Sequence, residues 1–122
     1  MFNFLKSSGP RVQPIAPADA IARAARGELT LIDVRDISEL KSSGKAAGAL
    51  HVPLATVQTR LNPKAGELPA GLAPDRPVCL YCAAGGRSAM AAEALLAFGY
   101  AEVYNLGGFG AWVSGGGQVE RI

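Results

Sequence analysis

The expected fold depends on one stretch of sequence, Val78-Cys79-Leu80-Tyr81-Cys82-Ala83-Ala84-Gly85-Gly86-Arg87-Ser88. It begins directly after Pro77 with an apolar run, residues 78–81, that is short enough to form a central β-strand. It leads into an alanine-rich segment, typical of a helix, that continues to Phe98 and stops at Gly99. We expect one face of this helix to carry Met90, Ala94, Leu95 and Phe98. Cys82 therefore lies at the mouth of a tight loop between a strand and a helix.

A loop of this kind directs successive backbone N–H groups toward one point, at the positive end of a helix. An anion placed there is stabilised, and the thiolate of Cys82 is the anion that the sequence supplies. Such surroundings lower the pKa of a cysteine from ~8.5 to roughly 3.5–7.5. We therefore expect Cys82 to be ionised and nucleophilic near neutral pH, stabilised by the N–H groups of residues 83–88.

The rest of the chain alternates between predicted strands and helices. We expect strands at residues 29–34, 49–52, 78–81 and 101–106, and helices at residues 18–26, 37–41, 54–61, 88–98 and 109–114. This alternation predicts an α/β domain with a mostly parallel central sheet of about five strands and helices on both faces. Ligands of such sheets bind beyond the carboxyl ends of the strands. Asp33 and Arg35, Cys82, and the pair Gly107-Gly108 follow three of these strands.

The bulk properties predict one domain at residues 15–122, preceded by an N-terminal arm at residues 1–14. A chain of 122 residues with 49% hydrophobic content can bury a core. The net charge of +2, with scattered basic residues, does not suggest a nucleic-acid partner. No run approaches the ~20 apolar residues of a membrane span, so we expect no stable membrane insertion. The first ten residues lack a signal-peptide pattern, and we expect a cytoplasmic protein. The oligomeric state is left open.

The two cysteines and the single histidine are too few for a disulfide framework or a conventional zinc site, so we expect neither a metal nor a cofactor. Cys79 and Cys82 have the spacing of a redox motif. Residues three apart in a strand face opposite sides, however, and Cys79 is expected to be a buried spectator. His51 is expected to make a structural hydrogen bond rather than to serve a Cys–His protease, and Trp112 to lie in the core.

Four collinear segments resemble the rhodanese-like sulfurtransferases. The pattern Cys82-x-x-x-x-Arg87-Ser88 after a strand resembles the active-site loop of that family. The other three segments resemble its first conserved strand end, its second signature and its closing one: Leu31-Ile-Asp33-Val-Arg35-Asp36, Gly44 to Pro53, and Gly107-Gly108-Phe-Gly-Ala-Trp112. Together they span nearly the whole chain.

The resemblance implies a single-domain sulfurtransferase. Cys82 would take a sulfane sulfur from a small anionic donor such as thiosulfate and hold it as a persulfide. It would then pass the sulfur to a thiophilic acceptor, which is cyanide, a small thiol or a protein thiol.

The other residues of the loop, Ala83, Ala84, Gly85, Gly86, Arg87 and Ser88, would bind the anionic substrate. Arg87 would bind the anionic donor or tie the loop to Asp33 or another carboxylate. Ser88 would cap the helix and could also hydrogen-bond to the sulfur. Asp33 and Arg35 would support the pocket by holding its loops, and Arg35 could also collect anions at the entrance.

Departures from the family pattern leave other functions open. Lys45 stands where the family commonly has His, Ala46-Ala47 where it commonly has an aliphatic residue and Pro, and Ala84 where many members have Ser. Ala83 and Gly86 are neutral where some members carry Lys or Arg, which weakens attraction for a doubly charged donor.

One alternative is a non-catalytic sulfur carrier or protein-binding module on the same fold. The other is a phosphatase or arsenate reductase-like enzyme. Phosphate-cradling loops have five residues between Cys and Arg, whereas this loop has four between Cys82 and Arg87.

Overall fold

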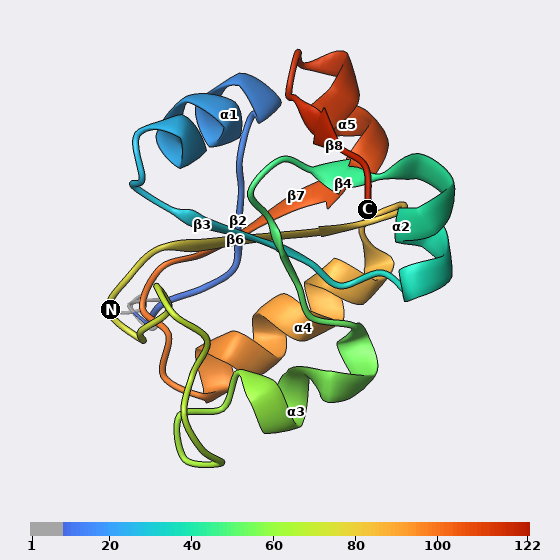
Figure 1. The fold of residues 1–122 in the computed structure, drawn as a ribbon. Coiled ribbons are helices and arrows are strands. Elements are labelled where there is room, and N and C mark those ends of the chain that lie inside the picture. The colour runs from blue at the N-terminus through green and yellow to red at the C-terminus, as the bar shows by residue number, and fades with distance from the viewer. Residues whose placement is uncertain (1–8) are drawn as a thin grey trace.

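The computed structural model describes residues 9–122. Within that range the chain forms short strands and helices in alternation (Figure 1). In chain order they are β2 (Gln13–Pro14), α1 (Pro17–Ala25), β3 (Thr30–Asp33), α2 (Ile37–Ser43), β4 (Lys45–Ala46), β5 (Leu50–His51), the 3₁₀ helix η2 (Leu54–Thr56), α3 (Val57–Arg60), β6 (Val78–Cys82), α4 (Gly86–Ala97), β7 (Val103–Gly108), α5 (Phe109–Ser114) and β8 (Val119–Glu120).

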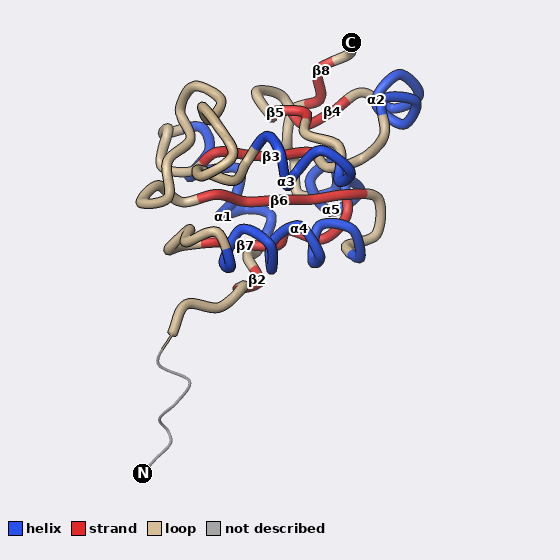
Figure 2. The backbone as a smooth tube through the Cα atoms, turned by 90° about the horizontal axis from the view of Figure 1, so that it is seen from below, coloured by secondary structure: helices blue, strands red, loops and turns tan. Residues whose placement is uncertain are grey.

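The main sheet has five strands in the order β2-β7-β6-β3-β5, and all of its pairings are parallel (Figure 2). The predicted α/β fold with a parallel sheet of about five strands is therefore confirmed. The strand β6 is central and is fully buried along its length, as its apolar sequence predicts. A separate antiparallel pair joins β4 to β8 near the C-terminus.

The edge strand β2 lies within the expected N-terminal arm. Gln13 and Pro14 pair with Tyr104 and Asn105 of β7, so the sheet extends into residues that we assigned to the arm from the sequence. Residues 1–8 of that arm lie outside the described residues.

Helices cover both faces of the sheet, with α1 and α5 on one side and α3 and α4 on the other (Figure 1). The two cores follow the alternation of side chains along β6. Cys79 and Tyr81 belong to one core, together with Ala20 of α1 and Trp112 of α5. Leu80 and Cys82 belong to the other, together with residues of α3 and α4. The prediction that the two cysteines face opposite sides is confirmed.

The buried face of α4 differs from the one that we predicted. The buried residues are Ser88, Ala91, Ala92 and Leu95, whereas Met90 is 65% exposed. Ala91 and Ala92 are small, which lets the helix lie close to the sheet. The helix also begins at Gly86, two residues earlier than expected. None of the helices in residues 9–122 has the length and apolar character needed to cross a membrane.

Candidate active site

The sharp connection between β6 and α4 places Cys82 at the start of a helix. The strand ends at Cys82, only residues 83–85 follow, and α4 begins at Gly86. Gly85 has a φ of +104°, in the left-handed region that glycine adopts without steric cost. This residue turns the chain so that the first amides of α4 face back toward the sulfur.

Groups of Gly85 and Ser88 hydrogen-bond to Cys82 Sγ. The N–H of Gly85 donates to the sulfur at 3.0 Å and the N–H of Ser88 donates at 3.4 Å. The Ser88 hydroxyl oxygen lies 3.4 Å from the same sulfur. Because Cys82 is only 1% exposed, little water competes for these contacts. The arrangement favours negative charge on the sulfur.

The pKa of Cys82 reflects two opposing effects. Burial raises the pKa of the thiol, but hydrogen bonds from the Ser88 hydroxyl and from the N–H groups of Ser88, Gly85 and Ala84 outweigh burial and lower it to about 7. Cys79 lies on the opposite face, where burial raises its pKa to about 12. Near neutral pH, Cys82 is therefore the thiol that ionises.

Arg87 is held by a carboxylate that we did not single out from the sequence. Its Nη1 and Nη2 donate to the two carboxylate oxygens of Glu39, at 2.7 and 2.9 Å. Arg87 therefore ties the loop to α2 through Glu39 and not through Asp33. A local signal for Glu39 exists, because Asp36-x-x-Glu39 is a capping box and the Asp36 N–H donates to Glu39 at 3.0 Å. Hydrogen bonds from Arg87 and then from the Asp36 N–H lower the pKa of Glu39 to about 2, despite some burial.

Ser88 is not the helix cap that we predicted. Gly85 occupies the N-cap position of α4, and Ser88 is the third helical residue. Its hydroxyl instead lies 2.8 Å from Asn105 Oδ1 and 3.2 Å from the Gly85 carbonyl oxygen, besides its contact with the sulfur. Ser88 is fully buried, so its hydroxyl belongs to the interior of the site.

Asn105 of β7 is a second residue that the sequence did not reveal. Its amide nitrogen donates to the Gly85 carbonyl oxygen at 3.3 Å, and its Oδ1 accepts from the Gly107 N–H at 3.0 Å. The register between β6 and β7 shifts at this point, because Asn105 lies opposite Leu80 and Gly107 lies opposite Tyr81. The only available signal was a polar residue within a predicted strand.

Gly108 allows β7 to lie directly against the loop. A Cβ atom at this position would be 2.6 Å from the carbonyl oxygen of Ala83. The Gly107-Gly108 pair that we expected beside Cys82 therefore makes close backbone contact with the loop.

Asp33 and Arg35 form a buried ion pair on the Tyr81 side of the sheet. Arg35 Nη2 lies 2.7 Å from Asp33 Oδ2, and it also donates to the Gly44 carbonyl oxygen at 2.8 Å. The guanidinium carbon lies 4.4 Å from the ring centre of Phe109. Among the described residues, no hydrogen bond joins either side chain to residues 82–88. The pair holds the connection from β3 to β4, and the donors of the Arg35 guanidinium are occupied by Asp33, Ser43 and Gly44.

The other residues discussed above have structural contacts. His51 Nε2 donates to the Arg35 carbonyl oxygen at 2.7 Å. Trp112 is 3% exposed and donates to the Gln118 carbonyl oxygen. Lys45 donates to the Ala49 carbonyl oxygen and pairs with Glu120 at 3.2 Å.

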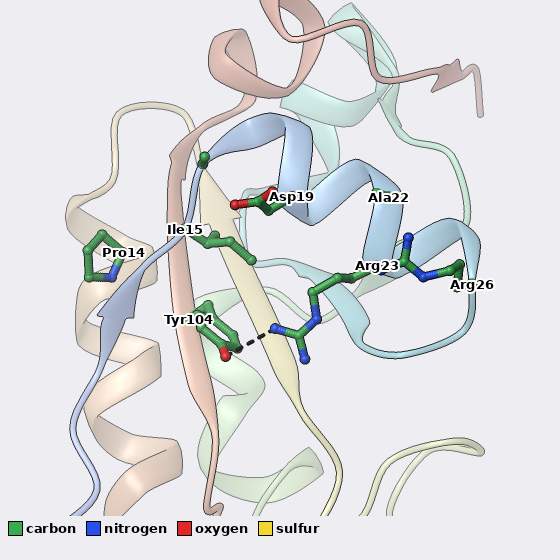
Figure 3. A pocket seen from close by; sticks show the side chains of 8 residues that line it. Pro14, Ile15, Asp19, Ala22, Arg23, Arg26 and Tyr104 are labelled. Atoms are coloured by element: carbon green, nitrogen blue, oxygen red, sulfur yellow. Dashed lines mark hydrogen bonds between the residues drawn. The ribbon is translucent and has the colours of Figure 1, made fainter.

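One surface hollow lies away from Cys82, between α1 and the edge of the sheet (Figure 3). Arg23 points toward Tyr104 there, and it is paired with Glu102 at 3.1 Å. Arg26, also in the lining, is paired with Glu28. The cations of this hollow are thus neutralised. Within residues 9–122, no group of three His, Cys, Asp or Glu side chains is placed to hold a metal ion.

Comparisons with known proteins agree with this geometry. The chain matches the Rhodanese-like domain over residues 16–115. It is 37% identical over 99 residues to the uncharacterized protein YqhL of Bacillus subtilis, covering 80% of this chain and 69% of that protein. It is 34% identical over 90 residues to a sulfurtransferase of Allochromatium vinosum, covering 73% and 76%.

A solved structure shares the fold. It is a protein of unknown function from Rhodopseudomonas palustris, described as a possible tyrosine phosphatase, with 31% identity and a TM-score of 0.78 over 89% of this chain and 85% of that one. The family match spans both the Cys82 loop and the β3 strand end. The chain therefore belongs to the family of rhodanese-like domains.

Proposed function

We propose that this protein is a sulfurtransferase that carries a sulfane sulfur on Cys82 as a persulfide. The observation that carries the proposal is the convergence of the Gly85 and Ser88 N–H groups and the Ser88 hydroxyl on Cys82 Sγ. These groups stabilise a thiolate, and a thiolate is the species that attacks a sulfur–sulfur bond. No general base is needed beside it, and Cys82 has none among the contacts described above.

In the first half-reaction, Cys82 attacks the sulfane sulfur of the donor. With thiosulfate, a new bond forms between Sγ and the outer sulfur while the donor's sulfur–sulfur bond breaks. Sulfite leaves with the electron pair of that bond, and the outer sulfur, which is negatively charged in thiosulfate, keeps that charge as the terminal sulfur of the persulfide. Charge and atoms balance without an oxidant or a reductant.

In the second half-reaction, an acceptor attacks the outer sulfur and Cys82 leaves as a thiolate. A thiol of lowered pKa leaves more readily. The hydrogen bonds that lower the pKa of Cys82 therefore assist both halves of the cycle. Cyanide, a small thiol and a protein thiol are the acceptors that this chemistry accommodates. Because the thiol must be free again after each cycle, we also propose a reducing, cytoplasmic location.

The charge of the loop bears on the choice of donor. Ala83, Ala84, Gly85 and Gly86 are neutral, and the guanidinium of Arg87 is bound at both ends by Glu39. The loop therefore offers backbone amides and no unpaired cation to a doubly charged donor. We propose that thiosulfate is accepted, but less readily than by a loop that carries lysine.

Incubation with thiosulfate followed by intact-protein mass spectrometry tests the proposal. We expect a gain of one sulfur atom that cyanide or dithiothreitol removes. The Cys82→Ser variant should gain nothing, whereas the matched Cys79→Ser variant should still gain the atom. If neither thiosulfate nor another sulfane donor adds sulfur, the protein is a binding module of the same fold and the proposal is wrong.

A phosphatase is the second candidate because of the description of the Rhodopseudomonas palustris protein. Only four residues separate Cys82 from Arg87, and the Arg87 guanidinium is occupied by Glu39. Both features disfavour a tetrahedral oxyanion in the loop. Hydrolysis of an aryl phosphate that depends on Cys82 would establish this second activity in place of the first.

A further inference from the structure

The hydroxyl of Ser88 has one hydrogen to donate and three neighbours that can accept it. Asn105 Oδ1 lies at 2.8 Å, the Gly85 carbonyl oxygen at 3.2 Å and Cys82 Sγ at 3.4 Å. A hydroxyl donates once and accepts through two lone pairs. Since Ser88 is fully buried, water cannot supply a further partner. The position of this hydrogen is therefore decided within the site.

The amide of Asn105 presents a fixed acceptor to Ser88. The Gly107 N–H donates to Oδ1 at 3.0 Å, and Nδ2 donates to the Gly85 carbonyl oxygen at 3.3 Å. These two contacts determine which end of the amide faces the hydroxyl. The separation of 2.8 Å between Ser88 Oγ and Asn105 Oδ1 is the usual length of an O–H···O hydrogen bond.

Cys82 changes its hydrogen-bonding role when it loses its proton. As a thiol it can donate to Ser88 Oγ, and Ser88 then donates to Asn105. As a thiolate it can only accept, and the Ser88 hydroxyl is the side-chain donor within reach of it, beside the N–H groups of Gly85 and Ser88. Asn105 and the thiolate thus compete for one hydrogen.

We propose that Asn105 is a positioning residue that acts on Cys82 through Ser88: its amide oxygen holds the Ser88 hydrogen while Sγ is uncharged and releases it to Sγ when Sγ is a thiolate. The inference rests on the proposed function, in which Sγ is charged in the resting enzyme and uncharged in the persulfide. The hydroxyl turns from Asn105 Oδ1 to Sγ, and no covalent bond of Ser88 or Asn105 is formed or broken.

A titration of the Cys82 thiol, followed by its alkylation rate against pH in the absence of any sulfur donor, tests this inference. The four proteins compared are the wild type, Asn105→Ala, Ser88→Ala and the double variant. The charges that bear on the sulfur are the same in all four: Arg87 from α4, with Glu39 and Asp36 from α2 behind it. From β7, residues 105–108 bring no charge, and the Asp33–Arg35 pair at the end of β3 lies on the Tyr81 side of the sheet.

We expect Asn105→Ala to move the titration midpoint to lower pH by up to about one pH unit, because the nearest acceptor that competes with the thiolate for the Ser88 hydrogen is lost. Ser88→Ala should move the midpoint to higher pH, because the thiolate loses a donor. The double variant should then have the same titration midpoint as Ser88→Ala alone. An unmoved midpoint, a rise, or an equal shift with and without Ser88 would overturn the inference.

Asn105→Asp supplies an independent test with the opposite sign. Its carboxylate binds the Ser88 hydrogen more strongly and adds negative charge, so the midpoint should rise, and it should rise less when Ser88 is replaced by alanine. If the midpoint rises equally with and without Ser88, the added charge alone explains the shift, and Asn105 does not act through Ser88. Because no sulfur donor is present, these outcomes are separate from the mass experiment, whose failure would reject the proposed function only.

Discussion

Glu39 and Arg87, which are 48 residues apart in the chain, form a two-pronged ion pair between the first turns of α2 and α4. The shorter contact is 2.7 Å, and each side chain is about one-third exposed. The pair connects the active-site loop to a helix that belongs to the β3–β4 connection. The loop is thereby held from outside, as well as by its own backbone.

Replacement of Glu39 by glutamine should remove part of the acid sensitivity of the fold. The pKa of Glu39 is lowered to about 2, so the pair contributes stability above the ordinary carboxyl pKa of about 4.3 and loses it as the pH falls through about 2. Because the pair is partly exposed, we expect a loss of about 0–1 kcal/mol near neutral pH. Glutamine preserves the capping box of α2. Urea unfolding of the wild type and the variant across the acidic range measures the effect. If stability depends on pH identically in both proteins, the prediction is wrong.

Alkylation of the native protein should follow a single titration with its midpoint near pH 7, the pKa of Cys82. Cys79 should stay unmodified, because burial raises its pKa to about 12. The fold should also lose stability as the pH falls from about 8.5, the ordinary thiol pKa, through about 7, and Cys82→Ser should lack this dependence. Peptide mapping after iodoacetamide treatment identifies the reacting thiol. A midpoint above pH 8 would show that the hydrogen bonds from Gly85 and Ser88 do not stabilise the Cys82 thiolate.

Replacement of Gly108 by alanine should displace the active-site loop. The added Cβ would be 2.6 Å from the Ala83 carbonyl oxygen, so either the loop or β7 must move. We expect a loss of about 1–3 kcal/mol in the free energy of unfolding, together with slower alkylation of Cys82. The matched control is Gly110→Ala, because nothing lies within 4 Å of that position and it is inside α5. Equal stability of the two variants in urea would show that the contact at Gly108 is unimportant.

Replacement of Asp33 by asparagine should be among the costliest single changes in the chain. The partner Arg35 would remain charged and buried, since the two side chains are only 0% and 4% exposed. Breaking a buried pair in this way costs about 3–5 kcal/mol. The exposed pair Arg26–Glu28 provides the control, and Glu28→Gln should leave the free energy of unfolding almost unchanged. Denaturation midpoints compare the two variants, and similar values would refute the buried role.

Local sequence patterns predicted the strands and helices because most of these elements are determined by short-range chemistry. The apolar run before Cys82, the glycine at position 85 and the stop at Gly99 each act within a few residues. The edge strand β2 was missed because two residues, one of them proline, give no periodic signal. The prediction of the buried face of α4 was wrong because the helix carries alanines on all sides. Hydrophobic spacing therefore could not decide whether Met90 is buried.

The residues of the candidate site also fall into two groups: those that the local sequence predicts and those that it does not. Cys82 and its loop form one continuous segment, and their chemistry can be inferred from neighbouring residues. Glu39 and Asn105 come from other parts of the chain, and only the packing of α2 and β7 against the loop brings them to it. Their residue types fit many exposed positions equally well, so no local pattern could identify them.

The sheet separates the two sulfur atoms of this chain, because the side chains of Cys79 and Cys82 project from opposite faces of β6. With no third cysteine in the sequence, no internal thiol can reach Cys82 to form an intramolecular disulfide. In the proposed cycle, a sulfur atom taken up by Cys82 would have to be passed to a second molecule. In the proposed cycle, the lifetime of the persulfide would therefore depend on how often an external acceptor meets Cys82.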